Sequence, residues 1–176
     1  MNKFEKLENT IIKNSISNRW NSAVQEWDII SMDEDEYASS ECICGNEGLR
    51  YLFEIKNRNN NNVLFPIGST CIKHFEREDL SLEVNIRNKM LKLYKCVNKG
   101  ERIELNSDYF SRNSLSFMYE NNVFKSTKYN DYNPYKDYRF MLDMFNKRVH
   151  SENQVRKINA IIVTSIIPYI RSQITR

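Results

Sequence analysis

Two short groups of cysteine and histidine, Cys42-x-Cys44-Gly45 and Cys71-x-x-His74, are the residues of this chain best suited to chemistry. Zinc in proteins binds its ligands in a tetrahedron, and it prefers thiolate sulfur and imidazole nitrogen. Cys42 and Cys44 flank an expected tight turn, in which Gly45 allows the backbone to double back. Cys71 and His74 are three residues apart at the start of an expected helix, so both side chains lie on one face. The sequence therefore predicts one structural Zn²⁺ ion bound by Cys42, Cys44, Cys71 and His74.

The ligand set leaves alternatives open. One residue separates Cys42 from Cys44, whereas about two to four residues usually separate paired zinc ligands. Cys96 is a second candidate for the fourth ligand in place of His74. A set of buried thiols without a metal, or a redox pair, would use the same cysteines.

The motifs of zinc enzymes and nucleotide-binding enzymes are missing from the sequence. Zinc deaminases carry His-x-Glu ahead of Pro-Cys-x-x-Cys, and zinc metalloproteases carry His-Glu-x-x-His. The chain has 2 histidines and 4 glycines, and none of the glycines forms a phosphate-binding loop. A nuclease would need a cluster of carboxylates that the sequence does not locate. We therefore expect a protein that is not an enzyme and has no catalytic residues.

The segments around the cysteines predict an α+β fold. Residues 49–56 and 63–67 have the composition of two β-strands, and the asparagine-rich segment 57–62 between them predicts a hairpin loop. A helix capped by Ser69 or Thr70 is expected to follow. A zinc knuckle, a β-hairpin and the start of a helix form a treble-clef-like arrangement, flanked here by an N-terminal helix and several C-terminal helices.

The N-terminal region is expected to contain a helix and an acidic loop. Residues 3–14 have apolar side chains at helical spacing, beginning with Phe4 and Leu7. The segment from Trp20 to Trp27 is ambiguous between a short helix and a strand. The run Asp33-Glu34-Asp35-Glu36 places like charges side by side, which indicates an exposed loop. A magnesium site and a surface that mimics nucleic acid are alternative interpretations of this run.

A long helix is expected after the second group of metal ligands. Apolar residues at helical spacing, beginning with Leu82 and ending with Val97, predict one inward face over residues 82–97, and Gly100 is placed to end the helix. Cys96 lies near this face, where a small buried apolar side chain is the usual role.

The last part of the chain is expected to be irregular and then helical. Residues 101–135 are polar with scattered aromatics and predict short strands and turns, whereas 137–149 have helical spacing. Ser151 and Gln154 form a capping box that opens a last helix. Pro168 is expected to kink or end that helix.

The chain is predicted to comprise three regions, which also differ in charge. These are an N-terminal helix with the acidic loop (1–40), a zinc-binding hairpin-helix module (41–80), and a mainly helical basic part (81–176) packed as one domain or as two closely associated ones. Residues 81–176 carry 17 basic and 9 acidic side chains, whereas residues 1–41 carry 4 and 9. A basic surface of this kind can meet nucleic acid or an acidic protein, or can be a solvated lysine-rich face.

The chain is expected to be cytoplasmic. No apolar run reaches the roughly 20 residues that span a membrane, and the first residues lack the apolar stretch of a secretory signal. Cysteines in the cytoplasm stay reduced, so metal binding or burial is expected in preference to disulfides.

A resemblance to known proteins lies in two segments, Cys42-Ile-Cys44-Gly45-Asn-Glu-Gly48-Leu-Arg-Tyr51 and Phe65-Pro-Ile-Gly68-Ser-Thr-Cys71-Ile-Lys-His74-Phe75. They resemble small phage and mobile-element proteins of low-GC Gram-positive bacteria that share a CxCG…IGSxCIxxF pattern. The group has no common activity, so the resemblance implies a zinc module and a mobile-element setting.

This setting suggests an inhibitor of bacterial defence. Small mobile-element proteins without an enzyme motif are often inhibitors of host machinery, and anti-CRISPR proteins that act on type II effector nucleases form one such class. The first hypothesis is therefore a zinc-stabilised protein that binds a CRISPR effector nuclease in the bacterial host cell and interferes with target DNA loading. The alternative is a nucleic-acid-binding zinc module of phage replication or recombination.

Overall fold

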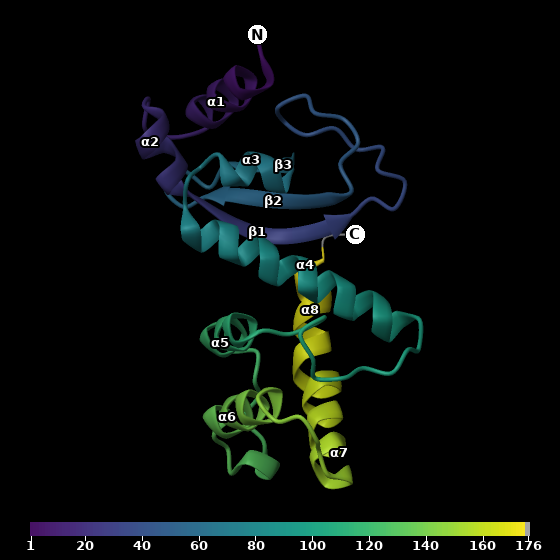
Figure 1. Cartoon of the computed structure of the whole chain (residues 1–176). Helices are drawn as coiled ribbons and strands as arrows, with labels where there is room; N and C mark the ends of the chain where they lie inside the picture. Colours follow the sequence, from purple (N-terminus) through teal and green to yellow (C-terminus); the bar gives the residue numbers. More distant parts are fainter. Residues whose placement is uncertain (175–176) are drawn as a thin grey trace. The chain divides into compact units, whose positions relative to one another are not determined.

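The computed structural model describes residues 1–174 and is α+β, with a three-stranded antiparallel sheet and several helices (Figure 1). The chain divides into two compact units, one formed by residues 1–87 with Gln173 and Ile174, and one formed by residues 88–172. Within residues 1–174, none of the helices combines the length and the apolar character that crossing a membrane requires.

The first unit is a small sheet with helices before and after it. Its strand order is β1-β2-β3, and both neighbouring pairs are antiparallel. The two strands predicted from the sequence and the hairpin loop between them are confirmed as β2 and β3. The elements of this unit are α1 (Lys3–Lys13), α2 (Trp20–Ala23), η1 (Val24–Glu26), β1 (Trp27–Glu34), β2 (Tyr51–Asn57), β3 (Val63–Ile67), α3 (Ser69–Lys73) and the first part of α4 (Glu78–Asn98).

Large apolar side chains from the sheet and from α1 form the core of the first unit. Trp27 of β1 and Phe53 of β2 are fully buried, as are Leu7 and Ile11 of α1. Helix α1 packs against α2, and α3 packs against β2 (Figure 1). The predicted N-terminal helix is therefore confirmed, although Phe4 of its apolar stripe remains 41% exposed.

The ambiguous segment around Trp20 contains both kinds of structure. A single helical turn, α2, continues into the 3₁₀ turn η1, and β1 begins directly afterwards at Trp27. Helix α2 buries Ala23, η1 buries Val24, and the strand then buries Trp27. No single periodicity fits because the backbone changes from helix to strand within these few residues.

The acidic run is only partly the exposed loop that the sequence predicts. Asp33 and Glu34 are the last residues of β1, where they pair with β2. The side chain of Glu34 is only 6% exposed, and its carboxylate accepts a hydrogen bond of 2.8 Å from Nε of Arg50. The guanidinium of Arg50, in the residue directly before β2, offsets the repulsion on which the loop prediction rested. Only Asp35 and Glu36 enter the turn after the strand.

A buried carboxylate fixes the entry to β1. Glu26 is 7% exposed and accepts hydrogen bonds from the backbone N–H groups of Ile16 and Ser17, both at 2.8 Å, and from Nδ2 of Asn57 at 2.7 Å. Burial by itself raises the pKa of Glu26, but the donors from Asn57, Ile16 and Ser17 outweigh it and lower the pKa below its ordinary value. The ionised carboxylate therefore stabilises this fold.

The second unit is helical in all of its regular elements. Its elements are the remainder of α4, α5 (Arg112–Glu120), the 3₁₀ turn η2 (Lys128–Asn130), α6 (Pro134–Phe145), α7 (Glu152–Ile161), the π-helical segment η3 (Ile162–Ile166) and α8 (Ile167–Gln173). The last residue of α8, Gln173, already belongs to the first unit. Helix α6 packs against α5 and α7.

The strands predicted within residues 101–135 are wrong. This segment contains helix α5 and the turn η2 instead. Ser111 caps α5 by accepting a hydrogen bond from the backbone N–H of Ser114 at 3.0 Å, and the helix buries Leu115 and Met118. The apolar residues at helical spacing therefore decide the structure, and the many surrounding polar residues obscure this short pattern.

The long helix α4 ends as predicted, before Gly100, whose φ of +69° suits glycine. Leu82, assigned to its inward face, is instead 42% exposed, whereas Met90 and Leu93 are buried. Helix α6 begins at Pro134 and ends at Phe145, before Val149, so the predicted helix 137–149 is displaced toward the N-terminus.

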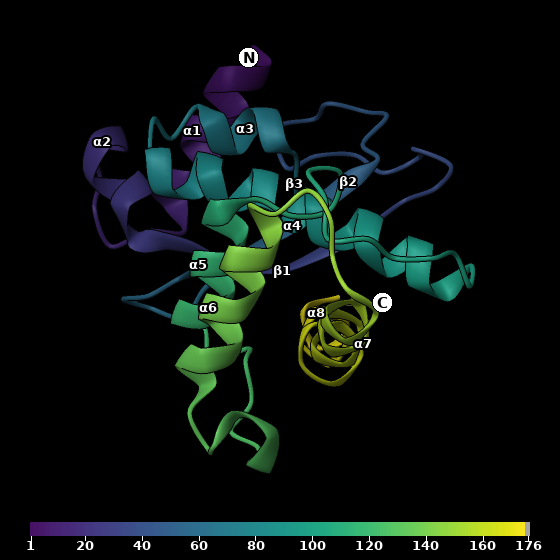
Figure 2. The same cartoon turned by 60° about the horizontal axis from the view of Figure 1, so that its bottom comes forward.

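Pro168 neither ends the last helix nor kinks it sharply. The helix runs from α7 through η3 to α8, and Figure 2 views α7 and α8 end-on as one nearly straight rod. Proline removes one backbone donor and its ring crowds the preceding turn. The wider π turn directly before Pro168, in which the N–H of Ile167 bonds to the carbonyl of Ile162, accommodates both effects. The capping box of Ser151 and Gln154 is confirmed.

The buried carboxylate predicts a specific acid sensitivity. Because the pKa of Glu26 is lowered in the folded protein, its stabilisation is present above the ordinary value of 4.5 and is lost as the pH falls through the folded-state pKa. We expect the free energy of unfolding of Glu26→Gln, measured by urea denaturation, to decline less between about pH 6 and about pH 3 than that of the wild type.

The matched control is Glu47→Gln, which changes an exposed carboxylate in the same unit. Its acid-dependent decline should equal that of the wild type. An equal decline for Glu26→Gln and the wild type would contradict a stabilising role for the ionised carboxylate.

Candidate metal centre

The turn that carries Cys42 and Cys44 is closed by its own backbone. The N–H of Gly45 donates to the carbonyl of Cys42 at 2.7 Å, and the N–H of Cys42 donates to the carbonyl of Asn46 at 2.9 Å. Gly45 has a φ of +83°, in the left-handed region, and a Cβ atom there would lie 2.9 Å from Nζ of Lys6. The predicted role of Gly45 in letting the chain double back is confirmed.

The loop between β1 and β2, which contains this turn, is held at its base. Ser40 and Leu49 form an isolated antiparallel bridge. The carboxylate of Asp35 accepts hydrogen bonds from the hydroxyl groups of Ser40 at 2.7 Å and Ser39 at 2.8 Å. These hydroxyl donors lower the pKa of Asp35 to about 2, so the carboxylate stays ionised across the physiological range.

Helix α3 supplies the third cysteine. The helix begins at Ser69 with Gly68 as its N-cap, and no side chain caps it. The predicted capping role of Ser69 or Thr70 is therefore wrong, because the chain enters the helix one residue earlier. The backbone N–H of Gly68 instead donates to Sγ of Cys42 at 3.3 Å. The first turn of α3 thus faces the cysteine turn.

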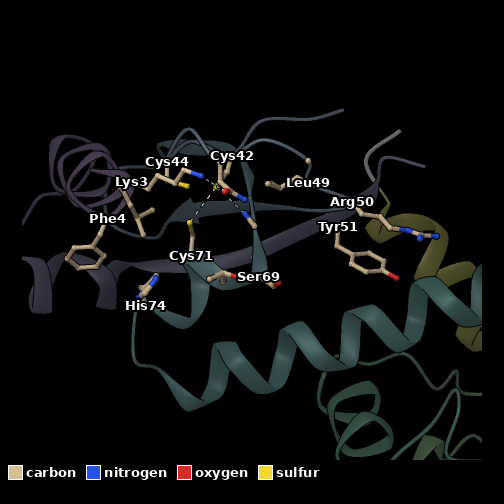
Figure 3. Close-up of a pocket in the computed structure, with 15 residues that line it drawn as sticks. Lys3, Phe4, Cys42, Cys44, Leu49, Arg50, Tyr51, Ser69, Cys71 and His74 are labelled. Atoms are coloured by element: carbon tan, nitrogen blue, oxygen red, sulfur yellow. Dashed lines mark hydrogen bonds between the residues drawn. The ribbon is translucent and has the colours of Figure 1, made fainter. Parts of the chain in front are cut away.

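The three cysteines predicted as ligands lie together. The sulfur atoms of Cys42, Cys44 and Cys71 are all within 4.8 Å of one another, and all three residues are buried (Figure 3). Sγ of Cys42 and Sγ of Cys71 are 3.6 Å apart. Tetrahedral zinc with Zn–S bonds of about 2.3 Å separates two sulfurs by about 3.8 Å. The arrangement is therefore of the right size to hold a metal ion.

The thiols of this group influence each other's ionisation. Hydrogen bonding to the Cys71 thiol lowers the pKa of Cys42 to about 5, with further help from the backbone N–H groups of Cys44 and Gly68, while burial acts in the opposite direction. The same contact with Cys42, together with burial, raises the pKa of Cys71. One thiolate is thus favoured in the group, and thiolate is the form that binds metals.

His74 lies beside this group without joining it. It follows α3 directly, is exposed, and packs its ring edge-on against Phe4 with the ring centroids 5.4 Å apart (Figure 3). Among residues 1–174, the three sulfurs are the only group of three or more ligating atoms that lie mutually within 4.8 Å, and His74 is not part of it. His74 and the three cysteines nevertheless line the same cavity. Its assignment as the fourth ligand stays a prediction.

Cys96, the alternative fourth ligand, has a different environment. It belongs to the second unit, is 4% exposed, and accepts a hydrogen bond of 3.3 Å from the hydroxyl of Tyr109. The expectation of a small buried side chain at this position is confirmed.

The sulfur group opens into a cavity of about 360 Å³. Helix α1 contributes Lys3, Phe4 and Leu7 to its wall, and the segment after the cysteine turn contributes Leu49. Helix α1 was not among the elements predicted to form the site. The apolar stripe of this helix indicated that Phe4 and Leu7 face inward, but no sequence signal identified the surface that they cover.

No family model, curated protein or solved structure matches this chain. The resemblance to phage and mobile-element proteins therefore still rests on residues 42–75, and the inhibitor function stays a prediction. That Cys42, Cys44 and Cys71 lie together is known from the structure and not from a comparison with known proteins.

Gly45 offers a test of how strongly the turn controls the sulfur group. Gly45→Ala must place a side chain at φ +83°, which costs about 1–2 kcal/mol of stability. Because the strain acts on the turn that positions Cys42 and Cys44, we also expect a weaker affinity for Zn²⁺, measured by competition with a chelating dye.

The control is Gly100→Ala, which introduces the same kind of strain at φ +69° with nothing within 4 Å of the new methyl group. We expect it to lower the melting temperature without changing the affinity for Zn²⁺. Equal affinities in the two variants would show that the turn does not position the sulfurs.

Proposed function

We propose that this chain is a zinc-stabilised binding protein in which the metal has a structural role. The observation that carries the proposal is the meeting of three buried cysteine sulfurs from two separate segments of the chain. Thiolate-rich sites are typical of structural zinc, and such sites supply folding free energy directly. The bound ion would join the loop between β1 and β2 to helix α3, in the manner of a treble-clef zinc site.

We further propose that His74 completes the ligand set. Three features support it: His74 is exposed, it lines the same cavity as the cysteines, and it follows Cys71 by three residues at the end of α3. Residues three apart on a helix lie on one face, so we propose that a change of the His74 side-chain rotamer would turn its ring toward the sulfurs. Its present contact with Phe4 is a single edge-on ring packing, which such a rotation would break.

The metal would favour binding of a partner by holding the loop between β1 and β2 in one conformation beforehand. A loop held in one conformation before it meets a partner loses less conformational entropy on binding. Inhibition of a CRISPR effector nuclease, predicted from the resemblance, is one function that this kind of scaffold would suit. The same preorganised loop would suit other protein partners as well.

Metal analysis of the purified protein tests the proposal. We expect one zinc ion per chain in the wild type, because three sulfurs and one imidazole fill a tetrahedral site. Cys71→Ser should lose the metal and unfold at a lower temperature. His74→Ala should remain folded with a reduced affinity, and its cobalt-substituted form should show altered d–d bands.

Cys96→Ser is the matched control, since it removes the remaining thiol of the chain. It should retain the full zinc content and the wild-type cobalt spectrum. A folded wild type that binds neither zinc nor cobalt would contradict the proposal. Loss of zinc in Cys96→Ser but not in His74→Ala would identify Cys96 instead of His74 as the fourth ligand.

A second candidate function is binding of single-stranded nucleic acid by the second unit. Residues 88–172 carry 15 basic and 8 acidic side chains. The rings of Tyr119 and Tyr138 stack with centroids 4.8 Å apart, and Tyr135 lies edge-on to Tyr119 at 5.7 Å. Tyr129 and Tyr132 are 82% and 72% exposed. Exposed aromatic rings next to basic residues are the elements on which unpaired bases stack.

Fluorescence anisotropy with a labelled oligothymidine tests this candidate. Binding should weaken steeply with added salt, because phosphate contacts release counterions. Tyr129→Ala should weaken binding by about fivefold or more, since stacking contributes on the order of 1–3 kcal/mol per base. Tyr37→Ala, which removes a tyrosine that is 91% exposed in the first unit, should have no effect. Absence of binding at low salt would exclude this function.

A further inference from the structure

The second unit contains a cavity of about 530 Å³ that none of the functions above uses. Four segments surround it: the irregular segment 102–107, the end of α6, the connection 146–150, and the first turns of α7. All of these residues belong to the second unit. Cavities of about 300–1,000 Å³ are the size that proteins use for small organic ligands.

Apolar side chains line part of this cavity. They come from three of the surrounding segments, which are distant in the sequence: Ile103, Leu105, Phe145, Val155 and Ile158. Leu105 and Ile158 are buried, whereas Phe145 and Val155 are partly exposed. A planar or apolar group of a ligand would gain free energy by covering these partly exposed side chains.

The charged residues of the same cavity are mainly basic. Arg102, Lys147 and Arg148 line it, and Glu104 is the acidic lining residue. Within residues 1–174, neither Arg102 nor Arg148 forms an ion pair, so their charges are not neutralised by the protein. Nζ of Lys147 donates a hydrogen bond of 3.1 Å to Oε1 of Gln154. Because this acceptor is a neutral amide, the bond does not neutralise the positive charge of Lys147.

One more cation lies next to the lining. The guanidinium of Arg112 donates to Oδ1 of Asn146, a lining residue, at 2.8 and 3.2 Å. A ligand with a single negative charge, such as a fatty acid, would satisfy one of these cations. The number of cations therefore favours a ligand with several negative charges on one end, and phosphate chains have this property.

Side-chain amides complete the lining. Asn106 and Asn159 contribute to the cavity, and an amide both donates and accepts hydrogen bonds. Such groups beside an apolar surface suit the edge of a nucleobase, whose ring faces are apolar and whose edge is polar. The ring of His150 is held by a contact of 2.8 Å between Nε2 and the carbonyl of Met144.

We propose that this cavity binds a nucleoside polyphosphate. The base would cover Phe145 and Val155, and the phosphates would lie among Arg102, Lys147 and Arg148. This inference does not depend on the zinc site, because the two sites share no residue and belong to different units.

Isothermal titration calorimetry of the full-length, metal-loaded protein tests the proposal with ATP, GTP, CTP and UTP as ligands. At least one triphosphate should bind. The corresponding nucleoside without phosphates and inorganic tripolyphosphate without a base should each bind at least about tenfold more weakly, because each lacks one half of the recognition.

Charge-neutralising variants locate the binding. Arg102→Gln and Arg148→Gln are exposed substitutions that should leave the fold intact, and each should weaken triphosphate binding by about tenfold, the value of one charged hydrogen bond. Lys128→Gln removes an equal charge from the same unit at a residue outside the cavity, and should have no effect.

Four results would overturn the proposal. Three of them are no binding by any of the four triphosphates, binding that Arg102→Gln and Arg148→Gln leave unchanged, and tripolyphosphate binding as tightly as the triphosphates. Equal binding of tripolyphosphate would identify a non-specific basic surface. Displacement of a bound triphosphate by a short oligothymidine, lost in the same two variants, would assign the cavity to a nucleic-acid strand and would also overturn it.

Discussion

The burial of three cysteine sulfurs in one small volume is the constraint on which the first unit depends. Two of them sit in a loop with little regular structure, and the third sits in a helix of 5 residues. Neither segment has a large apolar surface of its own. Thiolates placed this close repel each other, so the arrangement is favourable only when protons or a cation balance them. The backbone N–H groups that face Cys42 provide part of this balance.

Much of the first unit follows from local patterns in the sequence. The hairpin of β2 and β3 has alternating or β-branched residues and an asparagine-rich loop, and α1 has a clear apolar stripe. The acidic run could not be assigned correctly because its neutralising partner, Arg50, comes from a distant segment, the loop that leads into β2. The helix α5 was missed because its apolar residues are few and are surrounded by polar ones. Pro168 is tolerated because the backbone widens into a π turn, which sequence periodicity does not reveal.

The part of the candidate site that could be predicted is the part that the sequence spacing of the cysteines defines. Cys42 and Cys44 are neighbours in the sequence, and Gly45 indicates the turn between them and the hairpin. The ring of His74 packs against Phe4, which lies far away in the sequence, and spacing contains no information about such a contact. The cavity in the second unit was not predicted either, because its basic residues come from separated segments that only the fold brings together.

The path of the chain between the two units determines when the edge of β1 can be covered during protein synthesis. The chain leaves the first unit within α4 and returns to it at residues 173–174, where Ile174 forms a parallel bridge with Met32 of β1. The second unit is thus an insertion within the first. During synthesis, the outer edge of β1 stays unpaired at Met32 until the whole insertion has been translated. An open strand edge can pair with other chains. Rapid folding of the inserted helices would shorten the time during which the open edge of β1 can pair with another nascent chain.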